Sequence, residues 1–159
     1  MRSVEIWSGG QTGADRAAFD AALELGFAIR GWIPRGRRAE DGAISLSYPN
    51  LQETVSDDYD DRTARNVRDT DATLILGFGP LVGGTARTAQ VARELGRPML
   101  VLDLRSTDVE VAANAITRWL DSDTAIARLN VAGPRASQAP QLYELGRAVL
   151  RQALGASNA

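Results

Sequence analysis

The sequence lacks three residue types that carry much of enzyme chemistry. It has no cysteine, no histidine and no lysine, so all 18 of its basic residues are arginine. These absences exclude a thiol nucleophile, a Ser-His-Asp triad, a Schiff-base lysine and a zinc site made of histidine and cysteine. A Walker-type phosphate loop is also excluded, because that loop needs its lysine. Any chemistry must therefore come from Asp, Glu, Arg, Ser, Thr or Tyr side chains, or from backbone dipoles.

Long apolar runs and a strong charge imbalance are missing as well. No stretch approaches the roughly 20 apolar residues that a membrane-spanning helix needs. The formal net charge is −2, so we expect neither nucleic acid nor a membrane as a partner. The N-terminus runs directly into a strand-like segment without a signal peptide, and we therefore expect a cytoplasmic protein. With 44% hydrophobic residues, residues 1–159 are expected to form one domain with its own core.

Strand-like and helix-like segments alternate along the chain. Strands are expected at 4–7, 28–33, 72–78, 98–102 and 128–132, and helices at 14–25, 59–69, 85–95, 108–120 and 140–154. Such alternation predicts an α/β fold, with parallel strands joined by right-handed crossovers in a doubly wound sheet. Residues 34–50 are expected to form a long polar loop, a possible lid, and residues 155–159 a flexible tail.

Two glycine-rich turns each stand between a predicted strand and a predicted helix. The first contains Ser8, Gly9, Gly10, Gln11, Thr12 and Gly13, and the second contains Gly79, Gly83, Gly84 and Thr85. Such turns expose backbone N–H groups at the positive end of a helix, which favours binding of phosphate and other anions. Because the carboxyl ends of parallel strands converge, we expect these turns and a third at 133–137 to border one pocket. The alternative is that each turn only connects a strand to a helix.

Polar side chains beside the turns complete the candidate site. Asp15 and Arg16 lie in the first turn of their helix, and Gly133 and Arg135 belong to the third glycine turn. Arg37 stands in the long loop. Arginine is suited to two-pronged binding of oxyanions, so Arg16, Arg37 and Arg135 are candidate partners for a negatively charged ligand. For the loop arginine, a solvated surface position is an equally good interpretation.

The helix at 59–69 carries two further candidates. Asn66 and Asp69 share a face with Arg62, since their spacing follows i, i+4 and i+7. They are candidates for orienting the arginines of the site, and a solvated charged face is the alternative. The acidic residues at 57–61 are more typical of a charged helix start than of a metal site, so no metal is predicted.

Five stretches resemble the family of putative molybdenum carrier proteins: 8–16, 31–42, 62–69, the run 83–85 with Thr88, and 130–135. That family is similar to the molybdenum cofactor carrier proteins of algae and cyanobacteria. It lies within a Rossmann-like superfamily of nucleotide-ligand sensors and LOG-type phosphoribohydrolases. The resemblance implies a single Rossmann-like (flavodoxin-like) three-layer α/β domain with a five-stranded, mainly parallel sheet. It also implies a ligand pocket at the glycine turns and a homodimer or homotetramer.

The resemblance implies a carrier rather than an enzyme. LOG-type phosphoribohydrolases carry the motif Pro-Gly-Gly-x-Gly-Thr-x-x-Glu with a catalytic glutamate, and Thr88 stands at the position of that glutamate. We therefore predict a non-catalytic protein that binds molybdenum cofactor (molybdopterin) or a related phosphorylated, nucleotide-like ligand. Two alternatives stay open. One is a nucleotide-processing enzyme that uses Asp15, Asp41 or Asp69 as acid or base, and the other is a nucleotide sensor.

Overall fold

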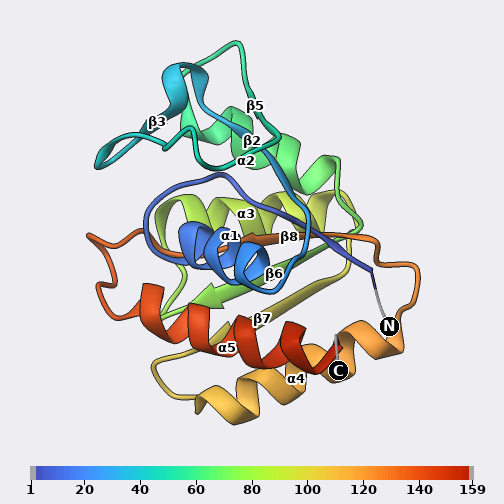
Figure 1. Ribbon diagram of the computed structural model, residues 1–159. Helices are drawn as coiled ribbons and strands as arrows, with labels where there is room; N and C mark the ends of the chain where they lie inside the picture. The colour runs from blue at the N-terminus through green and yellow to red at the C-terminus, as the bar shows by residue number, and fades with distance from the viewer. Residues whose placement is uncertain (1–2, 158–159) are drawn as a thin grey trace.

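A six-stranded parallel sheet forms the middle layer of the computed structural model, which describes residues 3–157 (Figure 1). Its strands lie in the order β5-β2-β1-β8-β6-β7, and every neighbouring pair is parallel. The strands are β1 (Glu5–Trp7), β2 (Ile29–Ile33), β5 (Leu51–Glu53), β6 (Ala72–Gly77), β7 (Met99–Asp103) and β8 (Arg128–Ala132). The predicted α/β fold with a mainly parallel sheet is confirmed.

The sheet has one strand more than the five that the sequence predicted. The additional strand, β5, is three residues long, and two of these residues are exposed. It pairs with β2 at the edge of the sheet, where Leu51 lies opposite Gly31. A short exposed edge strand lacks the apolar run by which the other five were recognised, so the sequence pattern gave no signal for it.

Helices cover both faces of the sheet (Figure 1). Helices α1 (Ala14–Glu24), α4 (Val109–Ser122) and α5 (Leu142–Ser157) pack over one face, and α2 (Tyr59–Arg68) and α3 (Gly83–Glu94) cover the other. Right-handed crossovers explain this division. The chain crosses the sheet in one direction from β1 to β2 and from β7 to β8, and in the opposite direction from β5 to β6 and from β6 to β7.

The main core lies between the sheet and the layer of α1, α4 and α5. Every residue of β6 is buried, as expected for a parallel strand with helices on both sides. Phe19 of α1 and Ile116 of α4 pack into the same cluster, together with Leu74 of β6. On the other face, Val67 of α2 packs against α3 in a smaller cluster. This packing holds the ends of β1, β6 and β8 in place, and these ends carry the site described below.

Residues 34–50 are more ordered than the long polar loop that was expected. They contain a 3-10 turn, η1 (Arg35–Arg37), and the short strands β3 (Arg38–Ala39) and β4 (Gly42–Ala43), which pair as an antiparallel hairpin. A small apolar cluster of Ile33, Ala39 and Ile44 anchors this hairpin. Helix α5 continues to Ser157, so residues 155–157 are helical where a tail was predicted, and residues 158–159 lie outside the described part of the chain.

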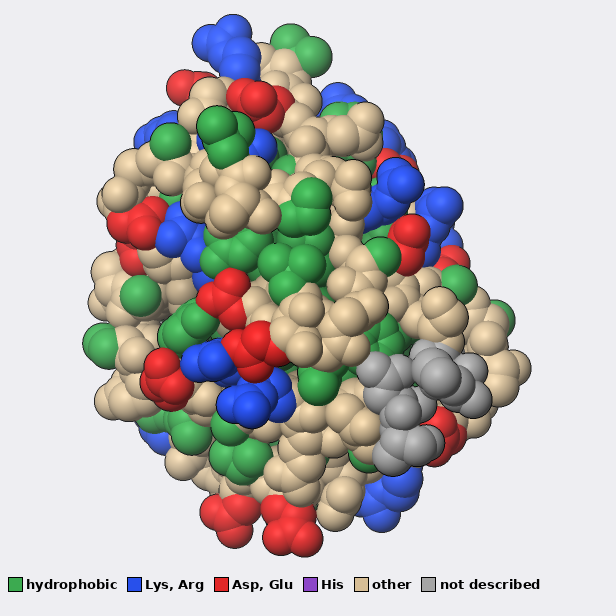
Figure 2. Space-filling model, viewed as in Figure 1, with side chains coloured by type: hydrophobic (Ala, Val, Ile, Leu, Met, Phe, Trp, Pro, Cys, Tyr) green, Lys and Arg blue, Asp and Glu red, His purple; other side chains and the backbone are tan. Residues whose placement is uncertain are grey.

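The surface carries charges of both signs. Figure 2 shows basic and acidic side chains close together on the face that it displays, in agreement with the small net charge of −2. Within residues 3–157, none of the helices combines the length and the apolar character that crossing a membrane requires.

Candidate functional site

A cleft of about 380 Å³ opens where the central strands β1, β8 and β6 end. The sheet changes its winding direction here, and ligands of open α/β sheets bind at such points. The volume falls within the range of small-molecule sites. The lining comes from the turn after β1, from α2, from the start of α3 and from the turn after β8. It comprises Gln11, Asp15, Asp58, Tyr59, Asp60, Arg62, Thr63, Gly83, Gly84, Thr85, Arg87, Thr88, Ala132, Gly133, Arg135 and Gln138.

The N-terminus of α3 opens into this cleft. Its N-cap residue is Val82, which provides no side-chain cap, and Gly84 has no described atom within 4 Å of the place where a Cβ would stand. The first N–H groups of a helix have no partner within the helix, and the helix dipole adds positive potential there. The start of α3 therefore offers backbone donors to an anion in the cleft.

A buried ion pair lies beside these donors. The Nη1 atom of Arg62 is 3.7 Å from Oδ2 of Asp15, and the two side chains are only 13% and 4% exposed. The Nε atom of Arg62 is buried and has no hydrogen-bond partner within residues 3–157. Gly9 makes room for this arginine, because a Cβ at that position would stand 2.3 Å from Nη1. Arg62 is therefore a largely buried cation that lines the cleft.

Burial shifts the acid–base properties of this pair. It raises the pKa of the Asp15 carboxyl above its ordinary value, although the Arg62 charge and the Gln11 N–H act in the opposite direction. Burial also lowers the pKa of the Arg62 guanidinium. An arginine nevertheless stays charged, since its ordinary pKa lies far above neutral pH. The cleft thus contains a permanent cation next to a carboxyl group that accepts a proton more readily than usual.

Asp15 predicts a specific pH dependence of stability. Its pKa is higher in the folded chain than the unfolded value of 3.8, so the folded state binds more protons. The resulting stabilisation is fully present below that value and is lost as the pH rises through the folded pKa. We therefore expect the free energy of unfolding of wild type, measured relative to that of Asp15→Asn, to decrease as the pH increases through the folded pKa of Asp15. Urea unfolding of both proteins from about pH 3.5 to about pH 7 measures the difference, and a constant difference would contradict the shift.

The first glycine turn uses many of its donors within the protein. The Gln11 N–H donates to Oδ2 of Asp15 at 3.1 Å, and the Thr12 N–H donates to the side-chain oxygen of Gln11 at 3.2 Å. The Ala14 N–H donates to the carbonyl oxygen of Pro134 at 3.3 Å. This turn therefore has fewer free donors for a ligand than the start of α3.

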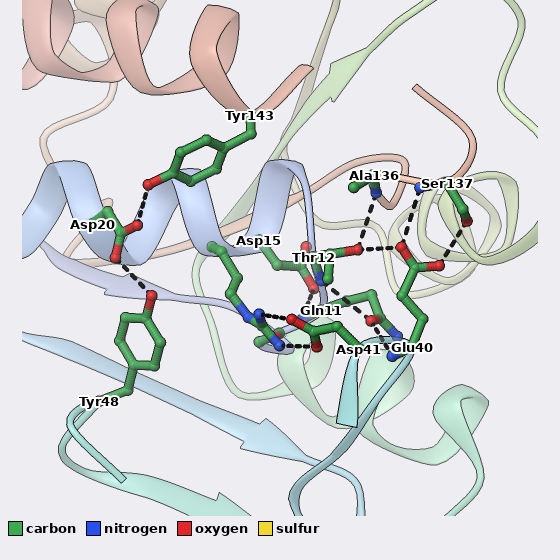
Figure 3. Close-up of polar contacts among 12 residues, drawn as sticks. Gln11, Thr12, Asp15, Asp20, Glu40, Asp41, Tyr48, Ala136, Ser137 and Tyr143 are labelled. Atoms are coloured by element: carbon green, nitrogen blue, oxygen red, sulfur yellow. Dashed lines mark hydrogen bonds and ion pairs between the residues drawn. The ribbon is translucent and has the colours of Figure 1, made fainter. Parts of the chain in front are cut away.

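Two adjacent carboxylates attach the β3–β4 hairpin to the segment that follows β1 and to the turn that follows β8 (Figure 3). Glu40 accepts hydrogen bonds from the Thr12 hydroxyl and from the N–H and hydroxyl of Ser137. Asp41 forms a two-pronged ion pair with Arg16, at 2.6 and 2.8 Å. The hairpin thus lies over the first glycine turn and reaches the turn that follows β8.

Asn66 and Asp69 connect α2 to β2 rather than lining the cleft. The Asn66 side chain accepts from the Trp32 N–H at 2.8 Å and donates to the Trp32 carbonyl oxygen at 2.9 Å. Asp69 accepts from the Trp32 indole N–H at 2.7 Å and pairs with Arg68. These contacts fix α2 against the sheet, so that Arg62 on the same helix is held in position.

Two other predicted residues also bond within the protein. The Arg37 guanidinium donates to the carbonyl oxygens of Ile44 and Ser45 and so closes the long loop on itself. The Gly79 N–H donates to the carboxylate of Asp103 at 2.9 Å. Of the predicted site residues, the cleft is lined by Gln11, Asp15, Gly83, Gly84, Thr85, Thr88, Gly133 and Arg135. Those that lie outside its lining are Ser8, Gly9, Gly10, Thr12, Gly13, Arg16, Arg37, Asn66, Asp69 and Gly79.

Several lining residues were not among the predicted site residues: Asp58, Tyr59, Asp60, Arg62, Thr63, Arg87 and Gln138. The sequence pattern could have indicated Arg62 as a site residue, because Arg62 shares a helical face with Asn66 in a polar helix that leads to the central strand. The Tyr59 ring lies 5.6 Å from the guanidinium carbon of Arg62 and 5.7 Å from that of Arg135. No local pattern identified Gln138. Within residues 3–157, no group of three acidic side chains is placed to hold a metal ion.

The fold and the cleft together define a Rossmann-type domain with a cleft at its switch point, the place where ligands of such folds bind. The model of the circularly permutated YpsA SLOG family matches residues 6–154, and the chain belongs to this family. The chain is also similar to a solved structure whose title is "Crystal structure of Putative molybdenum carrier protein", from Syntrophus aciditrophicus SB. The two are 43% identical, with a TM-score of 0.91, over 96% of this chain and 95% of the other. A search of curated proteins found no match. The resemblance inferred from the sequence is confirmed.

Proposed function

We propose that the protein binds a phosphorylated small molecule in the cleft and carries it without altering it, and that molybdenum cofactor is this ligand. The observation that supports the proposal most strongly is the uncapped start of α3, which borders the same cleft as the buried guanidinium of Arg62. Backbone N–H groups and an arginine side chain beside them form a suitable environment for a phosphate.

The charges around the cleft favour Arg62 as the principal cation. Arg87 is engaged with Asp60 at 3.0 Å, and both side chains are well exposed. Arg135 lies 3.9 Å from Glu40. Exposed pairs of this kind contribute little energy and are screened by salt. A ligand anion therefore gains most from the buried guanidinium, where the effective dielectric constant is lower.

The chemistry of molybdenum cofactor agrees with this environment. The cofactor carries a phosphate together with anionic molybdenum-oxo and dithiolene groups on a pterin, and both N–H groups and arginine bind such anions. The similarity to a solved protein named a putative molybdenum carrier protein supports a ligand that contains molybdenum. Thr88, at the position of the catalytic glutamate of the phosphoribohydrolases, donates its hydroxyl to the Gly84 carbonyl oxygen at 2.9 Å. A carrier needs no carboxylate at that position.

Gly84→Asp tests the position of the anion. The new side chain has space in the cleft, so the variant should fold, but its carboxylate would stand where we propose that the ligand oxyanion binds. We expect affinity for guanosine monophosphate and for isolated molybdenum cofactor to fall about 100-fold, the effect of about 3 kcal/mol of lost and opposing interactions. Gly84→Asn is the matched control, because it has the same size without the charge and should lose much less. Equal affinities for wild type and Gly84→Asp would place the site elsewhere.

The identity of the ligand is tested on protein purified anaerobically, by native mass spectrometry with ultraviolet absorbance. We expect a bound pterin with molybdenum. A bound nucleotide would favour a nucleotide sensor instead. Release of free base from nucleoside monophosphates, lost in Asp15→Asn, would show a nucleotide-processing enzyme, because Asp15 is the carboxyl in the cleft whose pKa burial raises.

A further inference from the structure

The carboxylate of Glu40 occupies a complete set of anion-binding donors. Its Oε1 atom accepts from the Thr12 hydroxyl and from the Ser137 N–H, the latter at 3.1 Å. Its Oε2 atom accepts from the Ser137 hydroxyl at 2.6 Å and lies 3.9 Å from Nε of Arg135. Three hydrogen bonds and one cation thus surround two oxygens, which is the arrangement that binds carboxylates and phosphates strongly.

The donors of this set do not depend on the hairpin for their place in the fold. The Ala136 N–H donates to Oγ1 of Thr12 at 3.0 Å, so the hydroxyl proton of Thr12 is directed elsewhere. Ser137 and Arg135 belong to the turn after β8, and Thr12 belongs to the turn after β1. Only the anion comes from the β3–β4 hairpin. The donors would therefore persist as an anion site if the hairpin moved.

The position of these donors connects them with the cleft. Arg135 lines the cleft and approaches Glu40. The side-chain oxygen of Gln11, another lining residue, accepts from the Glu40 N–H at 2.9 Å. Figure 3 shows the Glu40 carboxylate directed at Thr12 of the turn after β1 and at Ser137 of the turn after β8. An anionic group that extended from a ligand in the cleft toward these donors would therefore meet Arg135, which lies 3.9 Å from the Glu40 carboxylate.

We infer that Thr12, Ser137 and Arg135 form a second anion subsite beside the cleft, which Glu40 fills until a ligand with a second anionic group displaces it. This inference rests on the proposed function, since it adds a subsite to the same ligand site. It defines the ligand as a small molecule with two separate anionic groups, such as a nucleoside diphosphate or a pterin that carries a phosphate and a metal-oxo group. Displacement of Glu40 would leave the hairpin held by its apolar cluster and by the partly exposed ion pair of Asp41 and Arg16.

Glu40→Gln isolates the competition between side chain and ligand. A glutamine has one acceptor oxygen instead of two and no negative charge, so it cannot accept from all three donors or pair with the Arg135 guanidinium. The variant should therefore fill the subsite poorly. Phosphate can bind only those molecules whose subsite Glu40 does not occupy, so its apparent affinity is reduced by that fraction. We therefore expect inorganic phosphate to bind the subsite at least about tenfold more tightly in the variant.

The readout is a phosphate titration followed by backbone amide signals in ¹H–¹⁵N spectra. The Ser137 amide reports the subsite, and the Gly84 amide reports the cleft. We expect the amide signal of residue 137 to shift at markedly lower phosphate concentration in Glu40→Gln than in wild type, and this response to weaken when Ser137→Ala is added, because that change removes one of the donors. Asp41→Asn is the matched control, since it removes the neighbouring hairpin carboxylate and should leave the Ser137 response as in wild type.

The two signals separate the two proposals. If Ser137 responds equally in wild type and Glu40→Gln, or in neither, the subsite is refuted even when Gly84 responds. If Ser137 responds as expected and Gly84 does not, the subsite stands and the proposed phosphate position at the start of α3 is refuted. If Asp41→Asn enhances the Ser137 response as much as Glu40→Gln does, the effect is a general loss of negative charge and the specific role of Glu40 is overturned.

Discussion

Replacing Arg62 with glutamine is expected to abolish phosphate binding in the cleft and to lower the free energy of unfolding by about 3 kcal/mol or more. The binding loss follows from removing the buried cation beside the start of α3. The stability loss has a different cause. Asp15 is 4% exposed and has Arg62 as its ion-pair partner at 3.7 Å, so the variant leaves a buried carboxylate without its counter-charge. Urea unfolding and a phosphate titration measure the two effects separately.

The double variant Asp15→Asn with Arg62→Gln distinguishes the two effects. It removes both charges of the pair, so no uncompensated charge stays buried, and we expect it to recover most of the lost stability. It should not recover phosphate binding, since the cation is still absent. If Arg62→Gln alone is as stable as wild type, the pair is not buried as described. If the double variant binds phosphate like wild type, the cation that holds the anion is another arginine.

Gly133→Ala is expected to destabilise the protein by about 3 kcal/mol, the upper part of the range for forced overpacking. Gly133 directly follows β8 and lines the cleft, and a Cβ there would stand 2.2 Å from the carbonyl oxygen of Leu76 and 2.6 Å from Cβ of Ala14. The first contact is with the backbone of the central strand β6, and the second is with the start of α1. Neither can move without disturbing the strand ends that form the cleft.

Gly146→Ala is the matched control for this substitution. Gly146 lies inside α5, and its Cβ would meet Ala17 and Leu76 at 3.5 Å, which is ordinary van der Waals contact. Alanine favours a helix over glycine by about 0.5–1 kcal/mol, so we expect this variant to gain stability. Thermal or urea unfolding of the two variants should therefore give shifts of opposite sign. A Gly133→Ala variant as stable as wild type would mean that the strand ends are less closely packed than described.

The strands and helices that bury apolar residues were predictable from the sequence. The apolar run at 72–78 identified β6 correctly, and the helical spacing at 108–120 identified α4, because burial imposes these patterns on the chain. The elements that were missed, β5 and the β3–β4 hairpin, are short and mostly exposed. Each of these strands is only two or three residues long and buries at most one apolar side chain, so they leave no periodic signal.

The candidate site was predictable to the extent that it depends on where strands end. Parallel strands carry their following turns to one edge of the sheet, which is why Gly83, Gly84 and Arg135 could be named beforehand and all line the cleft. Ser8 and Gly10 belong to a turn at the same edge of the sheet but are not among the residues that line the cleft. Tyr59, which lies between the arginines of the cleft, had no signal of this kind.

The sequence by itself determined the α/β fold and the edge of the sheet at which the turns lie. It also excluded the kinds of catalysis that require lysine, histidine or cysteine. Only the tertiary structure decided which polar groups are free for a ligand. Thr12 meets Glu40, Asn66 meets Trp32, and Arg62 meets Asp15. Each of these partners lies at least 28 residues away along the chain. Such pairings depend on how distant segments pack and on the register of the strands, and no local pattern of residues encodes that geometry.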